Sequence, residues 1–520
     1  MVRVRAGGRE ARKAARRAAL PETLRPVRPG LTGGAYRPLT DEGVERILNA
    51  AYSALAEIGL ADAPDTGIAA MVEFGAEHRD GRLRFPRETV DRALGMAAKH
   101  VTLHGRDPIH DLDLSGTRVH YGTAGAAVHV VDRDGTYRHS TFADLVEAAR
   151  LVERLDNVHF FQRPMVCRDI EDNLLLDLAT IYACCANTTK HVGTSFSDPA
   201  HVSDCIELLH LIAGGPDGLA DGTGEAAWRA RPFVLNSNCF VVPPMKFATE
   251  SCMAMETAIA AGMPLLLLSA GQAGATAPAP LATAIVQAVA ECLAGVIYVQ
   301  SLAPGHPAVF GTWPFVSDLR TGAMSGGSGE QALLSAACAQ VHRHLGLPGG
   351  AAAGMADSKL PDMQAGWEQA ISNTMAGLAG LNMVYESVGM HASLLGFSFD
   401  SLVLGDDMLG QVQRCVRGVE VADDDVSLDA MRQVCLGSAD APPPGHYLGH
   451  QQTLDRMQRD YVYPAVADRT SPKEWEENGR PDLLVRARAR RDAIVASAPS
   501  TLLDAATESA IRARWAIPMP

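Results

Sequence analysis

The spacing of hydrophobic positions changes near residue 142, and this change separates two predicted parts of the chain. Before it, apolar residues recur at helical spacing from Val44 to Ile58 behind a Thr40 cap, which predicts an amphipathic helix. Residues 80–140 favour β structure, and Asp134-Gly135 predicts a two-residue hairpin turn. The pattern therefore predicts an α+β lead-in over residues 35–141.

After residue 142, short apolar segments alternate with longer helical ones. Most of the short segments are continuously apolar, as expected of parallel strands that are covered on both faces. The predicted strands are 158–166, 190–196, 233–242, 264–270, 308–313, 350–355 and 382–387, with an eighth near 401–405. Seven or eight such units in series predict a (β/α)8 TIM barrel, in the α/β class, over residues 142–425.

The remaining segments differ from the barrel in composition. Residues 1–34 are predicted to be a basic flexible N-terminal tail and connector, and the Gly-rich stretch 214–232 a flexible loop. Beyond residue 425 the chain becomes charged. Residues 426–520 are therefore predicted to form a C-terminal helical extension that covers the outside of the barrel.

The composition, charge and cysteine pattern of the chain exclude several classes of function. The 520 residues are 47% hydrophobic and carry a net charge of −14, which argues against nucleic acid as a partner. We see no uninterrupted apolar run of 18 residues and expect no membrane segment. The ten cysteines show neither CxxC nor Cys/His metal spacing, so we expect buried free thiols, no tightly bound metal and a cytoplasmic protein.

Polar and aromatic residues follow the predicted strands, where a barrel enzyme keeps its active site. The candidates are Lys190, His191, Asn236, Trp313, Phe315, Met355, Asp357, Tyr385, Glu386 and His391. Each has a structural alternative: Lys190 and His191 as a solvated strand end, Asp357 with Lys359 as an ion pair, His391 as a core histidine, and the aromatic residues as ordinary packing. A carboxylate such as Glu386, beside an apolar strand, must be paired or belong to a site.

Well-known catalytic fingerprints are missing from the sequence. We find no GxGxxG after a first strand, no GxxxxGK[ST] and no GxSxG. This pattern favours chemistry that needs little acid–base or covalent help from side chains.

Three long motifs carry a family resemblance: AVFGTWPFVSDLRTGAMSGGSGEQ (308–331), LGLPGGAAAGMADSKLPDMQAGWE (345–368) and NTMAGLAGLNMVYESVGMHASLLGF (373–397). With them the chain resembles the trimethylamine:corrinoid methyltransferase family, in the non-pyrrolysine branch that includes glycine betaine methyltransferase. The resemblance runs from about residue 30 through most of the chain. Met355 matches the position of pyrrolysine in the trimethylamine enzymes, so the resemblance favours a quaternary amine such as glycine betaine as substrate.

The resemblance also implies a mechanism. The nucleophile would be Co(I) of a corrinoid (cobalamin) carried by a partner corrinoid protein, and the enzyme would hold no metal of its own. By their positions in the loops after the predicted strands, Trp313, Phe315, Tyr385 and Met355 are expected to bind the substrate. Its carboxylate is expected to lie against His191, Lys190, Asn236 or His391. His391, Asp357 and Glu386 are the predicted catalytic residues.

Two other functions stay open at this point. A cofactor-free barrel lyase or isomerase would use Lys359 or His391 as a base. A binding protein would hold quaternary amines without turnover. We also expect a homo-oligomer, in which the small-residue stripe ALLSAACAQ (332–340) either packs on the barrel or forms a subunit interface.

Overall fold

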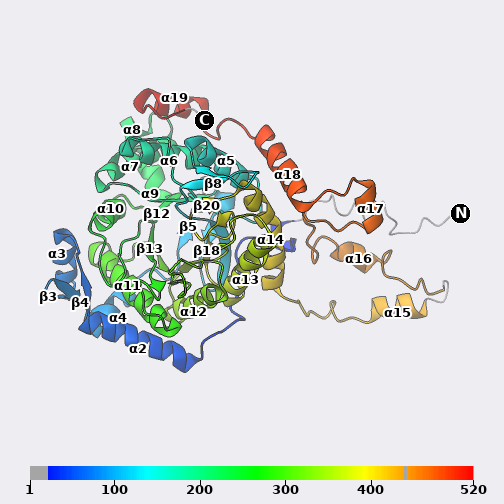
Figure 1. Cartoon of the computed structure of the whole chain (residues 1–520), viewed down its shortest axis with the longest axis horizontal. Coiled ribbons are helices and arrows are strands. Elements are labelled where there is room, and N and C mark those ends of the chain that lie inside the picture. Colours follow the sequence, from blue (N-terminus) through cyan, green and yellow to red (C-terminus); the bar gives the residue numbers. More distant parts are fainter. Residues whose placement is uncertain (1–20, 438–441, 519–520) are drawn as a thin grey trace.

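The computed structural model describes residues 21–437 and 442–518. At its centre is a closed ring of eight parallel strands surrounded by helices (Figure 1). In order around the ring, the strands are β7 (Arg118–Thr123), β10 (Phe160–Gln162), β11 (His191–Thr194), β12 (Val234–Asn236), β13 (Leu265–Ser269), β15 (Ala308–Thr312), β17 (Gly349–Ala352) and β18 (Met383–Tyr385). Parallel pairing of β18 with β7 closes the ring and confirms the predicted (β/α)8 barrel.

The eighth strand was predicted in the wrong place. Residues 401–405 belong to α14 (Phe399–Arg417), because their apolar positions continue at helical spacing as far as Val416 behind a Ser398 cap. The missing strand is β7, which lies inside the segment predicted as the lead-in. Its pairing with both β10 and β18 makes it a barrel strand.

A helix follows each barrel strand and covers the outside of the ring (Figure 1). These helices are α5 (Phe142–Glu153), α6 (Asn173–Asn187), α7 (Val202–Gly214), α10 (Thr249–Ala260), α11 (Leu281–Leu302), α12 (Gly329–Leu345), α13 (Met363–Ala379) and α14. The small-residue stripe 332–340 lies on α12, where most of its residues are buried against the barrel and α13. The stretch 214–232 is not a flexible loop, because it contains α9 (Thr223–Ala230) with Trp228 fully buried.

The lead-in packs on one side of the barrel. It contains α2 (Asp41–Glu57), α3 (Asp65–Glu73) and α4 (Arg87–Met96), and all three lie against α11. Val44, Ile47, Leu48 and Leu55 of α2 are buried, as the helical spacing predicted. The contact is close: a side chain at Gly67 of α3 would overlap the Tyr298 ring of α11.

This cover explains why α11 is apolar on every side. By length and composition α11 could cross a membrane, although it contains no uninterrupted apolar run of 18 residues. However, 83% of its most apolar window is buried, between the barrel and the lead-in helices. A helix that is hydrophobic all round belongs in such a position in the core of a large protein.

Residues at the two ends of the chain are placed as follows. Residues 1–20 of the predicted tail lie outside the described residues, whereas β1 (Leu31–Thr32) in the connector pairs with β7. The C-terminal segment is helical, with α15 (Asp429–Leu436), α16 (Gln451–Arg456), α17 (Pro472–Glu477), α18 (Leu483–Ser497) and α19 (Ala505–Arg514). Of these, α18 lies along α14 and α5, and α15 and α16 extend away from the barrel (Figure 1).

A small sheet forms from two hairpins. The predicted Asp134-Gly135 turn joins β8 (His129–Val131) to β9 (Tyr137–His139), and β8 also pairs with β20 (Gly396–Phe397), next to β19 (Met390–His391). Because β19 and β20 follow β18, this sheet lies beside the carboxyl end of the barrel.

Candidate active site

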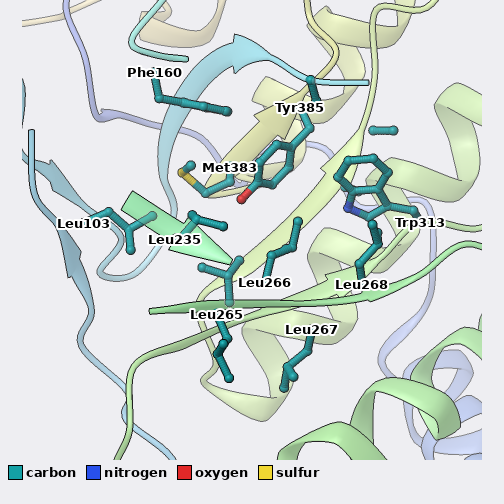
Figure 2. Close-up of a cluster of buried hydrophobic side chains, with 14 of the residues drawn as sticks. Leu103, Phe160, Leu235, Leu265, Leu266, Leu267, Leu268, Trp313, Met383 and Tyr385 are labelled. Carbon is teal, nitrogen blue, oxygen red and sulfur yellow. The ribbon is translucent and has the colours of Figure 1, made fainter. Parts of the chain in front are cut away.

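Three aromatic rings from different strands form a row inside the barrel, with Tyr385 between Phe160 and Trp313 (Figure 2). The Tyr385 ring centroid lies 5.1 Å from that of Phe160 and 5.1 Å from that of Trp313. Phe315 lies just beyond β15 in β16 (Phe315–Val316), and its ring is edge-on to that of Trp313, with the centroids 6.3 Å apart. Three of the predicted aromatic residues are therefore brought together at the carboxyl end of the strands.

Glycines on neighbouring strands make room for these rings. A Cβ atom on Gly350 of β17 would lie 2.7 Å from Cε2 of Tyr385, and one on Gly122 of β7 would overlap the Phe160 ring. Contacts this short are not tolerated by a packed ring. The two glycines therefore fix where the aromatic row can lie.

Four polar atoms near the aromatic row are buried without a hydrogen-bond partner in the described part of the chain. They are Gln162 Oε1, Trp313 Nε1, Tyr385 Oη and Glu386 Oε2. Buried polar groups in native proteins nearly always have a partner, so each such exception calls for an explanation. Two free donors and two free acceptors beside three aromatic rings indicate a ligand site.

Glu386 is the most unusual member of this group. Its side chain is buried, and burial alone raises the pKa of the carboxyl to about 8. Its backbone has φ +58°, a left-handed conformation that is costly for a residue with a Cβ atom. A strained backbone under an uncompensated buried carboxyl is a combination that marks functional sites.

Gln162 was not among the predicted site residues. It is the last residue of β10, where its Nε2 donates to Ser237 Oγ and its Oε1 stays free. A Cβ atom on Gly193 of the neighbouring strand would overlap Gln162 Oε1. The only sequence signal was a single polar residue at the end of the apolar run VHFFQ.

Asp357 and Met355 lie in the loop after β17 and hold neighbouring loops. The Asp357 carboxylate accepts hydrogen bonds from Ser325 Oγ at 2.6 Å and Ser393 Oγ at 2.8 Å. Lys359 donates to the backbone carbonyl of Asp357 and forms no ion pair with it. Met355 is fully buried against Gly326. Both residues are at the carboxyl end of the barrel, in supporting positions.

His391 is held by both of its ring nitrogens. Nδ1 lies 3.2 Å from the Ser358 carbonyl oxygen, and Nε2 lies 2.6 Å from Ser401 Oγ. Burial lowers the pKa of His391 to about 4, so the ring is neutral near pH 7. The catalytic role of His391 stays a prediction, and we do not include it in the site proposed below because neither nitrogen is free.

Lys190 and His191 lie at the opposite, amino end of their strand. Lys190 Nζ donates to the backbone carbonyls of Val152, in the last turn of α5, and of Leu155 and Val158, in the segment after it. His191 Nδ1 lies 2.7 Å from the carbonyl oxygen of His104. The structure therefore does not bring Lys190 and His191 to the aromatic row.

Asn236 also turns away from the site. Leu235 belongs to the buried cluster in the barrel interior (Figure 2), so the next residue along β12 faces the surrounding helices. The Asn236 side chain accepts a hydrogen bond from the Asn238 amide at 2.8 Å. Its role as a substrate ligand stays a prediction that the geometry does not favour.

The fold is that of a (β/α)8 barrel enzyme, a class in which active sites lie at the carboxyl ends of the parallel strands, where the candidate site is. The chain belongs to the family described as trimethylamine methyltransferase (MTTB), whose model matches residues 5–516. It is therefore a methyltransferase of that family. The described residues contain no group of three or more His, Cys, Asp or Glu side chains that could hold a metal ion.

Similar proteins agree with this assignment. The chain is 27% identical to a glycine betaine methyltransferase of Desulfitobacterium hafniense (strain Y51), covering 92% of this chain and 96% of that protein. It is 28% identical to the trimethylamine methyltransferase MttB of Methanosarcina thermophila, covering 77% and 80%. A solved Methanosarcina barkeri monomethylamine methyltransferase (MtmB) shares the fold, with a TM-score of 0.50, 12% identity, and coverage of 93% and 91%.

Proposed function

We propose that this methyltransferase moves a methyl group from a quaternary amine, glycine betaine or a related betaine, to the Co(I) corrinoid of a partner corrinoid protein. The observation that carries the proposal is the row of Phe160, Tyr385 and Trp313 beside the unpaired carboxyl of Glu386. Aromatic faces attract quaternary ammonium ions, and a buried carboxyl without a cation suits a ligand that brings a positive charge. The similarity to a glycine betaine methyltransferase supports the same substrate class.

The reaction makes few demands on side chains. Loss of a methyl group from R–N⁺(CH₃)₃ leaves a neutral tertiary amine, so the leaving group needs no proton. The corrinoid, carried by its own protein, acts as a substrate that accepts the methyl group. The enzyme then has to desolvate the ammonium group and align one methyl with the acceptor, and orientation alone can remove several kcal/mol of barrier.

The carboxylate of a betaine also needs hydrogen-bond donors. Trp313 Nε1 and Tyr385 Oη are buried donors without partners, and they replace Lys190, His191 and Asn236 as the groups we propose for this end of the substrate. We further propose that the protein is cytoplasmic, a homo-oligomer, and bound to neither nucleic acid nor membrane. The net charge of −14 supports the absence of a nucleic-acid partner, and the ten free cysteines, seven of them buried, support the cytoplasmic location.

A direct assay tests the proposal. Purified enzyme is mixed with cob(I)alamin and, separately, with glycine betaine, carnitine, proline betaine, tetramethylammonium and trimethylamine. We expect the absorbance of methylcobalamin to appear with at least one quaternary amine and not with trimethylamine. Methyl transfer from none of the quaternary amines, or from trimethylamine alone, would refute the proposed function.

A further inference from the structure

Glu386 lies buried at the carboxyl end of the barrel. It directly follows β18, and Cys239 follows β12 closely. These two strands are opposite one another, with β7, β10 and β11 between them on one side and β13, β15 and β17 on the other. The charge of Glu386 nevertheless contributes to raising the pKa of the Cys239 thiol, after desolvation, to about 11. Tyr385, the residue before Glu386, projects into the barrel (Figure 2), and the Glu386 side chain is itself 1% exposed.

The carboxyl of Glu386 has no cation to balance it. Desolvation is the whole cause of its raised pKa, and no lysine, arginine or histidine of the described residues forms an ion pair with it. The titratable group whose pKa the charge of Glu386 raises is the Cys239 thiol in the loop after β12, and Cys239 is an exposed residue. Glu386 is therefore protonated near pH 7 when nothing is bound, and solvent reaches the same end of the barrel.

The backbone on both sides holds Glu386 in its strained conformation. The Ser387 amide donates to the Gly122 carbonyl at 3.0 Å, and the Tyr385 carbonyl accepts from the Ala353 amide at 2.9 Å. Both bonds join barrel strands or their ends. In a regular strand, successive side chains point to opposite faces. The left-handed conformation of Glu386 interrupts this alternation at the end of β18, so Tyr385 and Glu386 can both point into the barrel.

We propose that Glu386 is the counter-ion of the substrate's fixed positive charge, losing its proton when a quaternary amine binds and regaining one after the methyl group has left. This inference rests on the proposed function. A quaternary ammonium has no N–H, so it cannot share the proton of Glu386. Binding must instead release that proton to solvent.

The second half of the cycle follows from charge. The methyl group leaves without the C–N bonding electrons, which stay on nitrogen as the lone pair of a neutral tertiary amine. The carboxylate has then lost its counter-charge, and it takes a proton from solvent as the product departs. Each turnover thus releases one proton on binding and takes up one on product release, and neither step involves the bond that is broken.

Isothermal titration calorimetry tests the inference on the full-length enzyme. Glycine betaine, or the quaternary amine that the methyl-transfer assay identifies, is titrated at pH 7 in phosphate and in Tris, whose ionisation heats differ. The difference between the two heats gives the number of protons exchanged. We expect nearly one proton released per amine bound, and about a tenfold gain in affinity from pH 6 to pH 7 that levels off above the pKa of about 8.

Two variants test whether the proton released on binding comes from Glu386. Glu386→Gln should bind the amine more weakly, release no proton and show an affinity that does not vary with pH. Glu291→Gln is the matched control, because Glu291 is an equally buried carboxyl that already accepts hydrogen bonds from Ser269 Oγ, the Met245 amide and Gln287 Nε2. It should release as many protons as the wild type. If Glu386→Gln does not fold, Glu386→Asp takes its place and should still release a proton, at lower affinity.

Several outcomes would overturn the inference. Binding by the wild type without proton release at pH 7 is one, and equal proton release by Glu386→Gln is another. Either result, together with methylcobalamin formation, would leave the proposed function intact. Absence of both binding and methyl transfer across the whole panel would instead refute the proposed function itself.

Discussion

Trp313 and Tyr385 each combine an aromatic ring with one unpartnered polar hydrogen, and the two parts can be tested separately. Trp313→Leu keeps apolar bulk but removes both the ring and its Nε1–H donor. We expect kcat/KM to fall about ten- to thirtyfold for tetramethylammonium, since a desolvated cation–π contact is worth ~2 kcal/mol, and to fall further for glycine betaine, whose carboxylate also loses a donor. Methylcobalamin formation with glycine betaine and with tetramethylammonium measures this.

Tyr385→Phe is the comparison for this prediction. It keeps the ring and removes the hydroxyl, so we expect weaker use of glycine betaine and unchanged use of tetramethylammonium, which has no carboxylate. Equal losses for both amines would contradict the proposal that the ring binds the ammonium group and the hydroxyl binds the carboxylate.

The uncompensated carboxyl of Glu386 also predicts a cost in stability. The pKa of Glu386 in the folded state is raised to about 8 from an ordinary 4.5. Its protonation therefore contributes fully to the free energy of unfolding below pH 4.5, and this contribution is lost as pH rises toward 8. We therefore expect Glu386→Gln to melt a few degrees above the wild type at pH 8 and at nearly the same temperature at pH 5. Calorimetry at the two pH values checks this, and a Glu386→Gln variant that is less stable at pH 8 would contradict it.

Position at or just after the end of a strand was enough to select Trp313, Tyr385 and Glu386 as candidates. It could not show which polar groups the scaffold already uses. The three carbonyls that accept from Lys190 Nζ come from residues more than thirty positions earlier, and the Ser401 hydroxyl that holds His391 lies on the next helix. Gln162 was missed because the sequence does not show which polar atoms lack a partner. Its free Oε1 acceptor is recognised only when the neighbouring side chains are known.

At the scale of elements, the glycine positions of β7 and β17 determine where the aromatic row lies. Gly350→Ala would place a Cβ atom 2.7 Å from the Tyr385 ring, so we expect a loss of about 1–3 kcal/mol in unfolding free energy and a lower kcat/KM. Urea unfolding and the methyl-transfer assay measure the two effects.

Gly366→Ala is the matched control for Gly350→Ala. Gly366 lies in α13, where a Cβ atom would meet nothing within 4 Å. We expect unchanged activity and a gain of up to about 1 kcal/mol, because alanine is the better helix former. Loss of activity in both variants would show that the effect of Gly350→Ala is not specific to the aromatic row.

Seven barrel strands could be read from apolar runs because each is buried between two layers and most of its residues are apolar. The eighth could not. β7 (RVHYGT) contains Arg118 and His120, and it looks like part of a half-exposed hairpin, whereas SLVLG looks like a buried strand and is one turn of an amphipathic helix. Short apolar runs of this kind do not distinguish strand from helix without their tertiary partners.

At the scale of the whole molecule, ion pairs tie the C-terminal helix α18 to the barrel. Arg488 Nε lies 2.7 Å from Asp400 Oδ2, and Arg491 Nη2 lies 2.6 Å from Glu147 Oε1. Asp400 is 5% exposed, so removal of its main partner leaves a buried carboxylate poorly compensated. Arg488 is itself partly exposed, which reduces the cost.

Arg488→Met is therefore expected to loosen α18, at a cost of about 1–3 kcal/mol, without changing kcat/KM. Limited proteolysis followed by mass spectrometry should find earlier cleavage between residues 470 and 500. The double variant Asp400→Asn/Arg488→Met should recover part of the protection, since it removes the uncompensated charge. Equal cleavage of the wild type and Arg488→Met would contradict a tethering role for this pair.

The position of α11 between barrel and lead-in has a consequence for synthesis of the chain. The helices that cover its outer face, α2, α3 and α4, come earlier in the sequence and leave the ribosome first. When α11 emerges, the helices that will bury its outer apolar face have already been synthesised. The order of the chain therefore limits aggregation and membrane insertion during translation, because the most apolar helix is synthesised only after the helices that cover it.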